Sequence, residues 1–353
     1  MTDNSSASFV ASLLGVLRLW AYPDESTAWR ADNAHWMGVL DLAEANKALL
    51  LAAEGMKRAG ISIPPEQQER LRAIRETCAM RALANLGITA TVCSILRTHG
   101  INAISLKGVL RAHRVYGRWD ARPAQDTDLL VTSADYRSAI AVLAANGFHS
   151  PIPAKSIWWH DYLGESPHLP LGGGTTVDLH HKIRQPGTPA PTDIARIIAN
   201  ARTAAVGGRT VPAMSDMDAA LLTATSLGKA LRGGEVWLHY AHELFVVTAR
   251  LDAKERAEYD AYAREMGIAR LWDFATQLAD DTFALPLAGA DALSEPRYHR
   301  VIELLDAEQR ERRGRRSTLL WKWTDGALMR PLRFTRELCF VRLGERRHDY
   351  EDP

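Results

Sequence analysis

Cysteine is scarce in this chain. The 353 residues include three cysteines, Cys78, Cys93 and Cys339. They are too few and too scattered for a disulfide framework or a zinc site, so we expect reduced thiols and a cytoplasmic protein. An excess of charge of one sign is also lacking, because 43 basic and 42 acidic residues leave a formal net charge of +1. Such a balance does not favour nucleic acid or a membrane surface as a partner.

Long apolar runs are missing as well. The opening stretch MTDNSSASFVASLLGVLRLW has no basic region before its apolar residues, which are spaced as on an amphipathic helix, so no signal peptide is expected. No later segment reads as long and apolar enough to cross a bilayer. The chain also contains no internal repeat and no low-complexity segment. Its 46% hydrophobic and 24% charged residues are typical of a soluble globular protein.

Both ends of the chain have the pattern of helices, with apolar residues at three- and four-residue steps. We expect an N-terminal helical region over residues 1–100 and a C-terminal helical region over residues 214–353. Pro64-Pro65 predicts the start of one long helix. Ser215, with Asp218 at the third helical position, predicts the start of another through a capping-box arrangement.

The middle of the chain, residues 101–213, mixes strand and helix patterns. Strands are predicted at 101–106, 127–132, 155–163 and 175–183. A helix follows the first strand, and a second helix is expected to begin at the N-cap Ser133. The last two strands would form a hairpin joined by the loop GESPHLPLGGG. The predicted fold class is α+β, a small mixed β-sheet core flanked by N- and C-terminal helical regions.

Two acids, Asp126 and Asp128, stand at the start of the second predicted strand. Residues two apart on a strand point to the same face, so the two carboxylates would converge. They would repel each other unless a cation or a proton lay between them, and Mg²⁺ prefers carboxylate and phosphate oxygens. Taken alone, so short a pattern is more often a solvated strand start.

A third acid, Asp178, interrupts the strand-like run TTVDLHHKI. Strand interiors disfavour Asp, so its presence asks for a reason. If this strand pairs beside residues 127–131, Asp178 would join the same metal centre and could draw a proton from an attacking hydroxyl. An edge-strand acid that faces water is the alternative.

Basic residues that could hold a phosphate lie near these acids. Lys107-Gly108 stands between a predicted strand and a helix, where backbone N–H groups attract anions and glycine permits close approach. Arg122 could bind a phosphate through its planar fork. Lys229 is a more distant phosphate candidate. Arg111 and Arg118 are further candidates, with a solvated surface role as the alternative, and a plain turn is the alternative for Lys107-Gly108.

Taken together, the segments LKGVLRAHRVYG, RPAQDTDLLV and VDLHHKI resemble a bacterial nucleotidyltransferase family. That family belongs to the superfamily that includes DNA polymerase β and the aminoglycoside nucleotidyltransferases. The resemblance covers residues 100–185. It implies that Asp126 and Asp128 bind metal, that Asp178 is the third acid, and that Lys107-Gly108 and Arg122 face phosphate. The usual superfamily turn is Gly-Ser or Gly-Gly, whereas this chain has Lys-Gly.

The resemblance implies an enzyme that moves a nucleoside monophosphate from an NTP, with ATP favoured, to an acceptor hydroxyl or phosphate. Two Mg²⁺ ions are the implied cofactors, with Mn²⁺ as an alternative. A small molecule or a peptide is the expected acceptor, since members of the family are often encoded beside natural-product and peptide-modification genes; RNA is less favoured. The alternative is a non-catalytic nucleotide-binding or antitoxin-like partner protein on the same fold.

Other conspicuous residues receive no chemical role at this stage. Trp158, Trp159 and Trp237 are interpreted as packing residues. One of His180 and His181 could face inward beside the metal, with a surface role as the alternative, and His239 and His242 stay unassigned. The Arg-rich segment 310–316 is interpreted as a solvated helix face, with binding of an acidic substrate or RNA as the alternative.

Overall fold

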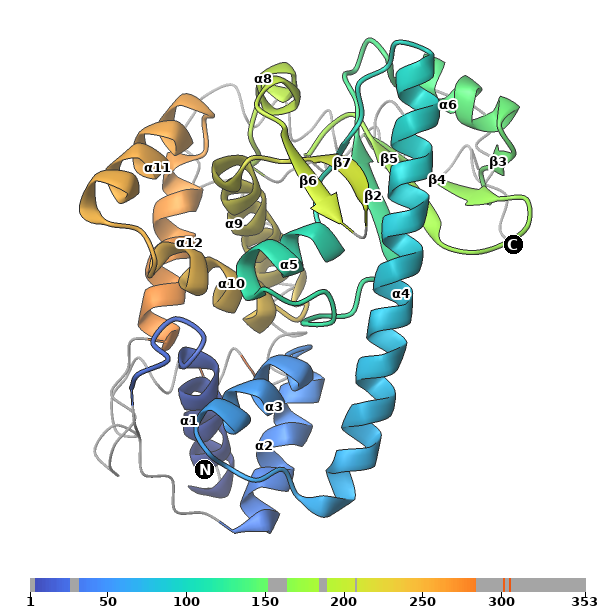
Figure 1. The fold of residues 1–353 in the computed structure, drawn as a ribbon. Helices are drawn as coiled ribbons and strands as arrows, with labels where there is room; N and C mark the ends of the chain where they lie inside the picture. Colours follow the sequence, from blue (N-terminus) through green and yellow to red (C-terminus); the bar gives the residue numbers. More distant parts are fainter. Residues whose placement is uncertain are drawn as a thin grey trace, which may run out of the picture.

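The structure, a computed structural model, describes residues 4–25, 32–151, 164–183, 189–206 and 208–283, together with Val301 and Leu305. Within these ranges the chain forms a mixed sheet surrounded by helices (Figure 1), which confirms the predicted α+β class. The strand predicted at 155–163, with Trp158 and Trp159, and the Arg-rich segment 310–316 lie outside the described residues, as does Cys339. Cys78 and Cys93 are buried free thiols.

The N-terminal part of the chain is helical, as predicted. Its helices are α1 (Asn4–Arg18), α2 (Asn33–Ala45), α3 (Leu49–Arg58) and α4 (Pro65–Thr98). Helix α4 begins where Pro64-Pro65 predicts, with Pro65 at its first position, where a missing N–H costs nothing. It runs beside α3 at one end and along the sheet at the other (Figure 1).

In the part of the chain that the structure describes, seven strands form one sheet in the order β3-β4-β5-β2-β1-β7-β6. They are β1 (Ile104–Ser105), β2 (Asp126–Leu130), β3 (Phe148–His149), β4 (Glu165–Pro170), β5 (Thr176–His180), β6 (Arg202–Val206) and β7 (Arg209–Ala213). The pairs β2–β5 and β1–β7 are parallel, and the other neighbours are antiparallel. The sheet is therefore mixed, as predicted.

The predicted loop GESPHLPLGGG is wrong in its first half, because Glu165–Pro170 forms strand β4 and pairs with β5. Its prolines suggested a loop, yet alternate residues are buried, as in a strand with one covered face. Ser166 and His168, on that buried side, satisfy each other through a 2.9 Å contact between Oγ and Nε2. The sheet edge β6–β7 was not anticipated at all.

Seven further helices complete the described fold. They are α5 (Val109–Tyr116), α6 (Tyr136–Ala145), α8 (Ile194–Ala199), α9 (Asp216–Gly233), α10 (Leu238–Thr248), α11 (Ala253–Glu265) and α12 (Ala269–Phe283). Ser215 caps α9 as predicted, accepting a hydrogen bond from the Asp218 N–H. The N-cap predicted at Ser133 is wrong, since α6 starts after Asp135 and the Ser133 Oγ lies 3.0 Å from His181 Nδ1 instead.

The two faces of the sheet pack against different helices. On β2, Leu129 points into the apolar core beneath α4 and α6, whereas Leu130 points into the larger core formed with α1, α5, α9, α10 and α12. Thr127 shares the α4 side, where its hydroxyl donates to Asn85 O. Since side chains alternate along a strand, Asp126 and Asp128 must face away from α4. Their carboxylates thus open toward the C-terminal helices.

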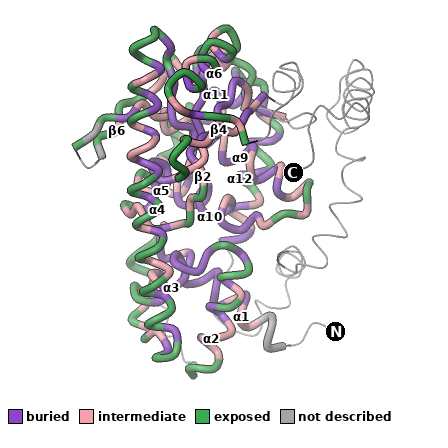
Figure 2. The backbone as a smooth tube through the Cα atoms, turned by 90° about the vertical axis from the view of Figure 1, so that its right-hand side faces the viewer, coloured by how far each residue is buried: buried purple, intermediate pink, exposed green. Residues whose placement is uncertain are grey.

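Helix α4 corrects the expectation that no segment could span a membrane. By length and composition alone it is the one helix in the described ranges that could do so, and 39% of its most apolar stretch is buried in the protein. Buried and exposed residues alternate along it (Figure 2). Asn85 on its buried side donates to the backbone oxygens of Ala124 and Asp126. Its buried apolar residues pack in the core with the sheet, and polar residues between them interrupt any continuous apolar run.

The buried side chain of His242 connects helices α1, α5 and α10 through hydrogen bonds. His242 of α10 is fully buried; its Nε2 lies 2.9 Å from Leu17 O at the end of α1, and its Nδ1 lies 3.2 Å from the Tyr116 hydroxyl of α5. A neutral ring that donates from Nε2 and accepts at Nδ1 satisfies both contacts. Burial lowers the pKa of His242 to about 4, in spite of its bond to Leu17.

We expect the free energy of unfolding to fall as the pH is lowered from about 6.5 to about 4, because the unfolded chain takes up a proton at His242 that the folded chain excludes. The contribution is on the order of 3 kcal/mol for a shift of that size. Urea unfolding of the wild type and of His242→Gln across this range measures it. The variant should show a flatter dependence on pH; equal slopes would contradict the assignment.

Candidate metal centre and phosphate-facing turn

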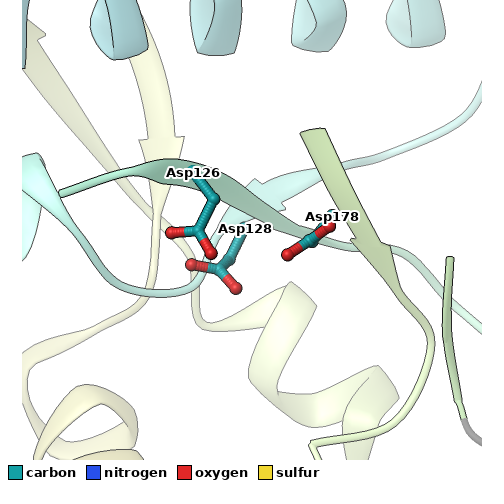
Figure 3. A group of neighbouring side chains, drawn as sticks. All are labelled: Asp126, Asp128 and Asp178. Carbon is teal, nitrogen blue, oxygen red and sulfur yellow. The ribbon is translucent and has the colours of Figure 1, made fainter. Parts of the chain in front are cut away.

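Strand register brings the three predicted acids together. Strands β2 and β5 run parallel, with Asp128 directly opposite Asp178, and Asp126 two residues before Asp128 on the same face. Each of the three carboxylates offers an oxygen, and these oxygens all lie within 4.8 Å of one another. Figure 3 shows Asp126 and Asp128 side by side on β2 and Asp178 reaching toward them from β5. The sequence predicted a shared site only if the strand of Asp178 paired with residues 127–131, and β5 pairs with β2 in this way.

Asp128 is the most deeply held of the three acids. Its side chain is 2% exposed, and its Oδ1 lies 2.9 Å from Lys107 Nζ and 3.1 Å from His180 Nε2. His180 lies two residues beyond Asp178 on β5, hence on the same face, and its Nδ1 is 3.3 Å from a carboxylate oxygen of Glu165 on β4. A chain of contacts across three strands therefore fixes Asp128.

Burial and neighbouring charges give Asp128 and Asp178 different pKa values. Burial works to raise the pKa of Asp128, but the bond from His180 and the charge of Lys107 outweigh it and bring the pKa to about 2. Burial and the nearby Asp128 carboxylate raise the pKa of Asp178 to about 6. Environments that push two carboxyl pKa values apart are typical of sites where one acid stays ionised and another exchanges a proton.

The charge balance of the cluster fits a metal cation. Among the residues that the structure describes, no hydrogen bond or ion pair reaches the carboxylates of Asp126 or Asp178. The positive group of Lys107 offsets one of three converging negative charges, and burial, together with repulsion from Asp128, raises the pKa of Asp178. A divalent ion with oxygen ligands, such as Mg²⁺ or Mn²⁺, would relieve it.

The Lys107-Gly108 turn lies where the sequence predicted it, between β1 and α5. Gly108 is the N-cap of α5 with φ +80° and ψ −136°, a conformation in which any side chain is strained even though a Cβ would meet open space. The first N–H groups of α5 therefore follow a turn that already places Lys107 on Asp128. Anion binding at this turn stays a prediction, supported by the electropositive start of the helix.

The predicted phosphate ligand Arg122 is partly buried and already holds a partner. Its Nη1 donates to Glu243 Oε2 at 3.0 Å, and its guanidinium lies 5.8 Å from the centre of the Tyr240 ring. One edge of its planar fork is thus engaged, so a phosphate role for Arg122 stays a prediction. Lys229 lies half-buried on α9, and no contact in the described ranges joins it to the three acids.

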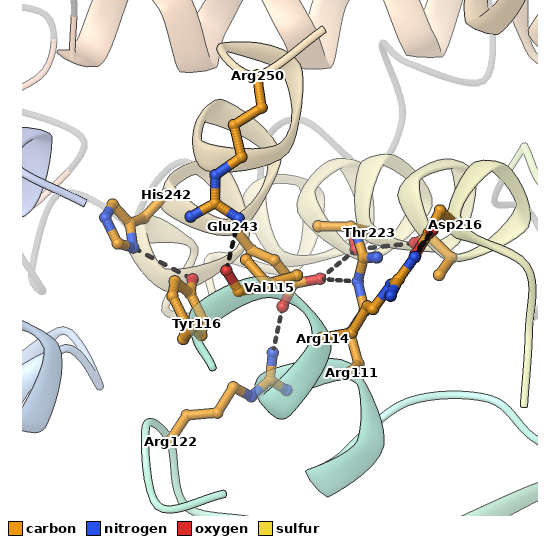
Figure 4. Close-up of polar contacts among 11 residues, drawn as sticks. Arg111, Arg114, Val115, Tyr116, Arg122, Asp216, Thr223, His242, Glu243 and Arg250 are labelled. Carbon is orange, nitrogen blue, oxygen red and sulfur yellow. Dashed lines mark hydrogen bonds and ion pairs between the residues drawn. The ribbon is translucent and has the colours of Figure 1, made fainter. Parts of the chain in front are cut away.

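Glu243 is a residue of this region that the sequence did not single out. It is fully buried on α10; its Oε1 accepts from Arg111 Nε at 2.8 Å and from the Thr223 hydroxyl at 2.6 Å, while Oε2 accepts from Arg122. Figure 4 shows these side chains converging on Glu243 from α5, α9 and the segment before β2. Burial opposes ionisation, yet the two arginines lower the pKa of Glu243.

The signal for Glu243 was present but weak. The run HELFVVT places one acid in an otherwise apolar helix, which is unusual unless that acid is paired. Its partners lie far away in sequence, however. Of the four histidines singled out in the sequence, His180 belongs to the carboxylate cluster, and His181, His239 and His242 are buried. Trp237 is fully buried, which confirms its packing role.

Comparison with known proteins agrees with this geometry. A family model described as uncharacterised nucleotidyltransferase matches residues 32–284, which include the sheet, the three acids and helices α2 to α12. No curated protein matches the chain. Because the family model covers well over half of the sequence, the chain belongs to the uncharacterised nucleotidyltransferase family.

Proposed function

We propose that this protein is a magnesium-dependent enzyme that transfers a nucleoside monophosphate from an NTP, with ATP favoured, to an acceptor hydroxyl or phosphate. The observation that carries the proposal is the convergence of Asp126, Asp128 and Asp178 within 4.8 Å on one face of the sheet. Family membership supports the reaction class. It leaves open the acceptor, for which a small molecule or a peptide remains our proposal.

In this proposal Asp126, Asp128 and Asp178 would hold two Mg²⁺ ions, or Mn²⁺ in their place. The bound metal would neutralise charge on the transferring phosphoryl group and on the oxygens that attack and leave. Asp128 stays ionised near neutral pH, because His180 and Lys107 hold its pKa near 2 in spite of its burial. His180 and Glu165 keep its carboxylate in place.

Asp178 would take the proton of an acceptor hydroxyl. Burial and the Asp128 carboxylate raise the pKa of Asp178 above its usual range, and a carboxylate placed beside the attacking oxygen can accept its proton. The acceptor oxygen then forms a bond to the α-phosphorus, the bond from that phosphorus to the bridging oxygen of the β-phosphate breaks, and pyrophosphate leaves. An acceptor phosphate would attack without this proton transfer.

The basic residues would bind the triphosphate. Lys107 lies against Asp128, and the N–H groups at the start of α5 follow directly after Gly108. Arg122 and Lys229 complete the proposed set. We further propose that residues 101–213 form the catalytic core and that the helical regions 1–100 and 214–353 wall the cleft and choose the acceptor.

A non-catalytic nucleotide-binding or antitoxin-like role is the competing proposal. A binding module has no need for three carboxylates packed at a distance where they repel one another, and keeping them there costs stability. The retained cluster therefore favours the enzyme.

Calorimetry with Mg²⁺ and each NTP tests the proposed function. We expect at least one Mg²⁺–NTP complex to bind, ATP first, and binding to weaken when EDTA removes the metal. When the protein is incubated with an NTP labelled at its α-phosphate and a cell extract that contains the acceptor, the label should appear in a new product. Failure of every NTP to bind in the presence of Mg²⁺ or Mn²⁺ would exclude the enzyme, and binding without any transfer would favour the non-catalytic alternative.

A further inference from the structure

A cavity of about 1090 Å³ lies next to the proposed phosphate turn. Helix α5, strands β6 and β7, the first turn of α9 and one side of α11 surround it. Lys107 lines the cavity and also contacts Asp128, so the cavity begins where the carboxylate cluster ends. Its volume lies just above the usual range of small-molecule sites, roughly 300–1,000 Å³.

Arg111 supplies the observation that points to a ligand in this cavity. Arg111 is 8% exposed, and its Nε donates to Glu243. Its Nη2 is buried and has no hydrogen-bond partner among the described residues. An unsatisfied buried donor on a charged group is costly, so such a group normally has a partner. Arg111 also lines the cavity, so an anion that draws the guanidinium toward the cavity would supply the missing partner.

Other cations strengthen the positive potential at this end of the cavity. Arg114 is bonded to Asp216, and Arg111 and Arg202 act on the same carboxylate from a greater distance; together with the Arg114 bond they lower the pKa of Asp216. Figure 4 shows Arg111 reaching toward Glu243 and Arg114 toward Asp216 from the same helix. No described carboxylate pairs with Arg202.

The remaining walls are of mixed character. Ala204, Ala213 and Met214 give an apolar surface between the sheet and α9, and Tyr259 and Tyr262 cover the cavity from α11. Three acids of α11 also line it, Glu255, Glu258 and Glu265. Glu265 is paired with Arg196, and Glu255 caps its own helix. Glu258 lies 4.0 Å from Lys254. Arg202 has no carboxylate partner among the described residues, and Arg111 shares the single charge of Glu243 with Arg122.

We propose that this cavity holds the acceptor, and that the acceptor is an organic molecule whose carboxylate or phosphate group is bound by Arg111. The inference rests on the proposed nucleotide transfer, for which it names the class of second substrate. The Arg111 guanidinium uses only its Nε on Glu243, so its terminal N–H groups remain for an anion; Arg202 adds charge, and the apolar wall packs against the carbon body. Lys107 marks the end at which the acceptor oxygen would meet the nucleotide.

Benzoate and phenyl phosphate, with neutral benzamide for comparison, are suitable probes for the full-length protein. We expect NMR titration to show that the two anions bind more tightly than benzamide, and that Arg111→Gln weakens them about tenfold or more, as expected for a lost charge-assisted hydrogen bond. Arg202→Ala, at an exposed strand position, should weaken them about threefold, as estimated for a partly screened charge. Arg97→Ala, which removes an exposed arginine of α4 that does not line the cavity, is the matched control.

Arg111→Lys guards against a folding defect, because lysine keeps a cation beside Glu243 while losing the planar fork. It should fold and still bind the anions more weakly than the wild type does. Equal affinity of the wild type, Arg111→Lys and Arg202→Ala for both anions would overturn the inference. Calorimetry of the wild type with Mg²⁺–ATP is run in parallel. If the wild type binds Mg²⁺–ATP but does not prefer the anionic probes to benzamide, the proposed acceptor class is wrong and the proposed function stands. If the wild type does not bind Mg²⁺–ATP, the proposed function is wrong.

Discussion

Replacing Asp128 with Asn is expected to lower the rate of nucleotide transfer by at least about 10³-fold, because metal-borne charge stabilisation is worth several kcal/mol in the transition state. The side chain keeps its shape, and its amide oxygen can still accept from Lys107 and His180. The change therefore removes the charge while leaving the packing of β2 in place. Steady-state transfer of labelled α-phosphate from ATP, with calorimetry of Mg²⁺ or Mn²⁺, measures both consequences.

The matched control for this experiment is Asp41→Asn, which removes an exposed acid of α2 far from the cluster. It should leave transfer within about twofold of the wild type, as surface substitutions usually do. Asp126→Asn should act in the same direction as Asp128→Asn. Intact transfer in either cluster variant, with unchanged metal affinity, would show that the three acids do not form the metal centre.

Replacing Glu243 with Gln is expected to lower the free energy of unfolding by about 3–5 kcal/mol, the usual cost of breaking a buried ion pair from one side. The side chains of Arg111 and Arg122 are 8% and 15% exposed, and both would lose their negative partner. The glutamine could still accept from Thr223 and Arg111, but its amide N–H₂ would face Arg122. Urea or thermal unfolding at neutral pH measures the loss.

The exposed pair of Glu44 and Arg70 provides the comparison, since both side chains are over 40% exposed. Glu44→Gln should cost no more than about 1 kcal/mol, because solvent screens exposed pairs. If the two variants lost similar stability, Glu243 would not hold the arginines as described. A large loss for Glu243→Gln alone would show that one acid of α10 positions residues of both the phosphate region and the cavity.

The local chemistry of the carboxylate cluster could be predicted from the sequence. Asp-x-Asp at a strand start places two carboxylates on one face whatever the fold, and Lys107-Gly108 between strand and helix follows from the same local reasoning. The pairing of β2 with β5 was a condition that the sequence could state but not prove. Register between strands about fifty residues apart depends on packing over the whole sheet.

The missed features all depend on tertiary context. Strand β4 contains Pro167 and Pro170 and a polar buried side, so its sequence resembles a loop until Ser166 and His168 are seen to satisfy each other. Arg111 and Glu243 are 132 positions apart, and no local pattern reports their contact. Arg122, predicted to bind phosphate, also donates to Glu243, and this contact too joins residues far apart in the sequence. Ser133 has the composition of an N-cap, but His181 supplies a competing partner.

The opposite packing of neighbouring residues on β5 has an evolutionary consequence. Val177 and Leu179 are fully buried in the core beneath α4, and Asp178 between them faces the cluster. A slip of one residue in the β2–β5 register would turn Asp178 into that apolar core and bring a hydrocarbon side chain among the acids. Misregistered chains would therefore be purged as unstable before they could be tested as catalysts. Selection for a stable core would by itself preserve the alignment of the acids, and a one-residue insertion within β5, which would reverse the faces of the residues beyond it, should not be tolerated.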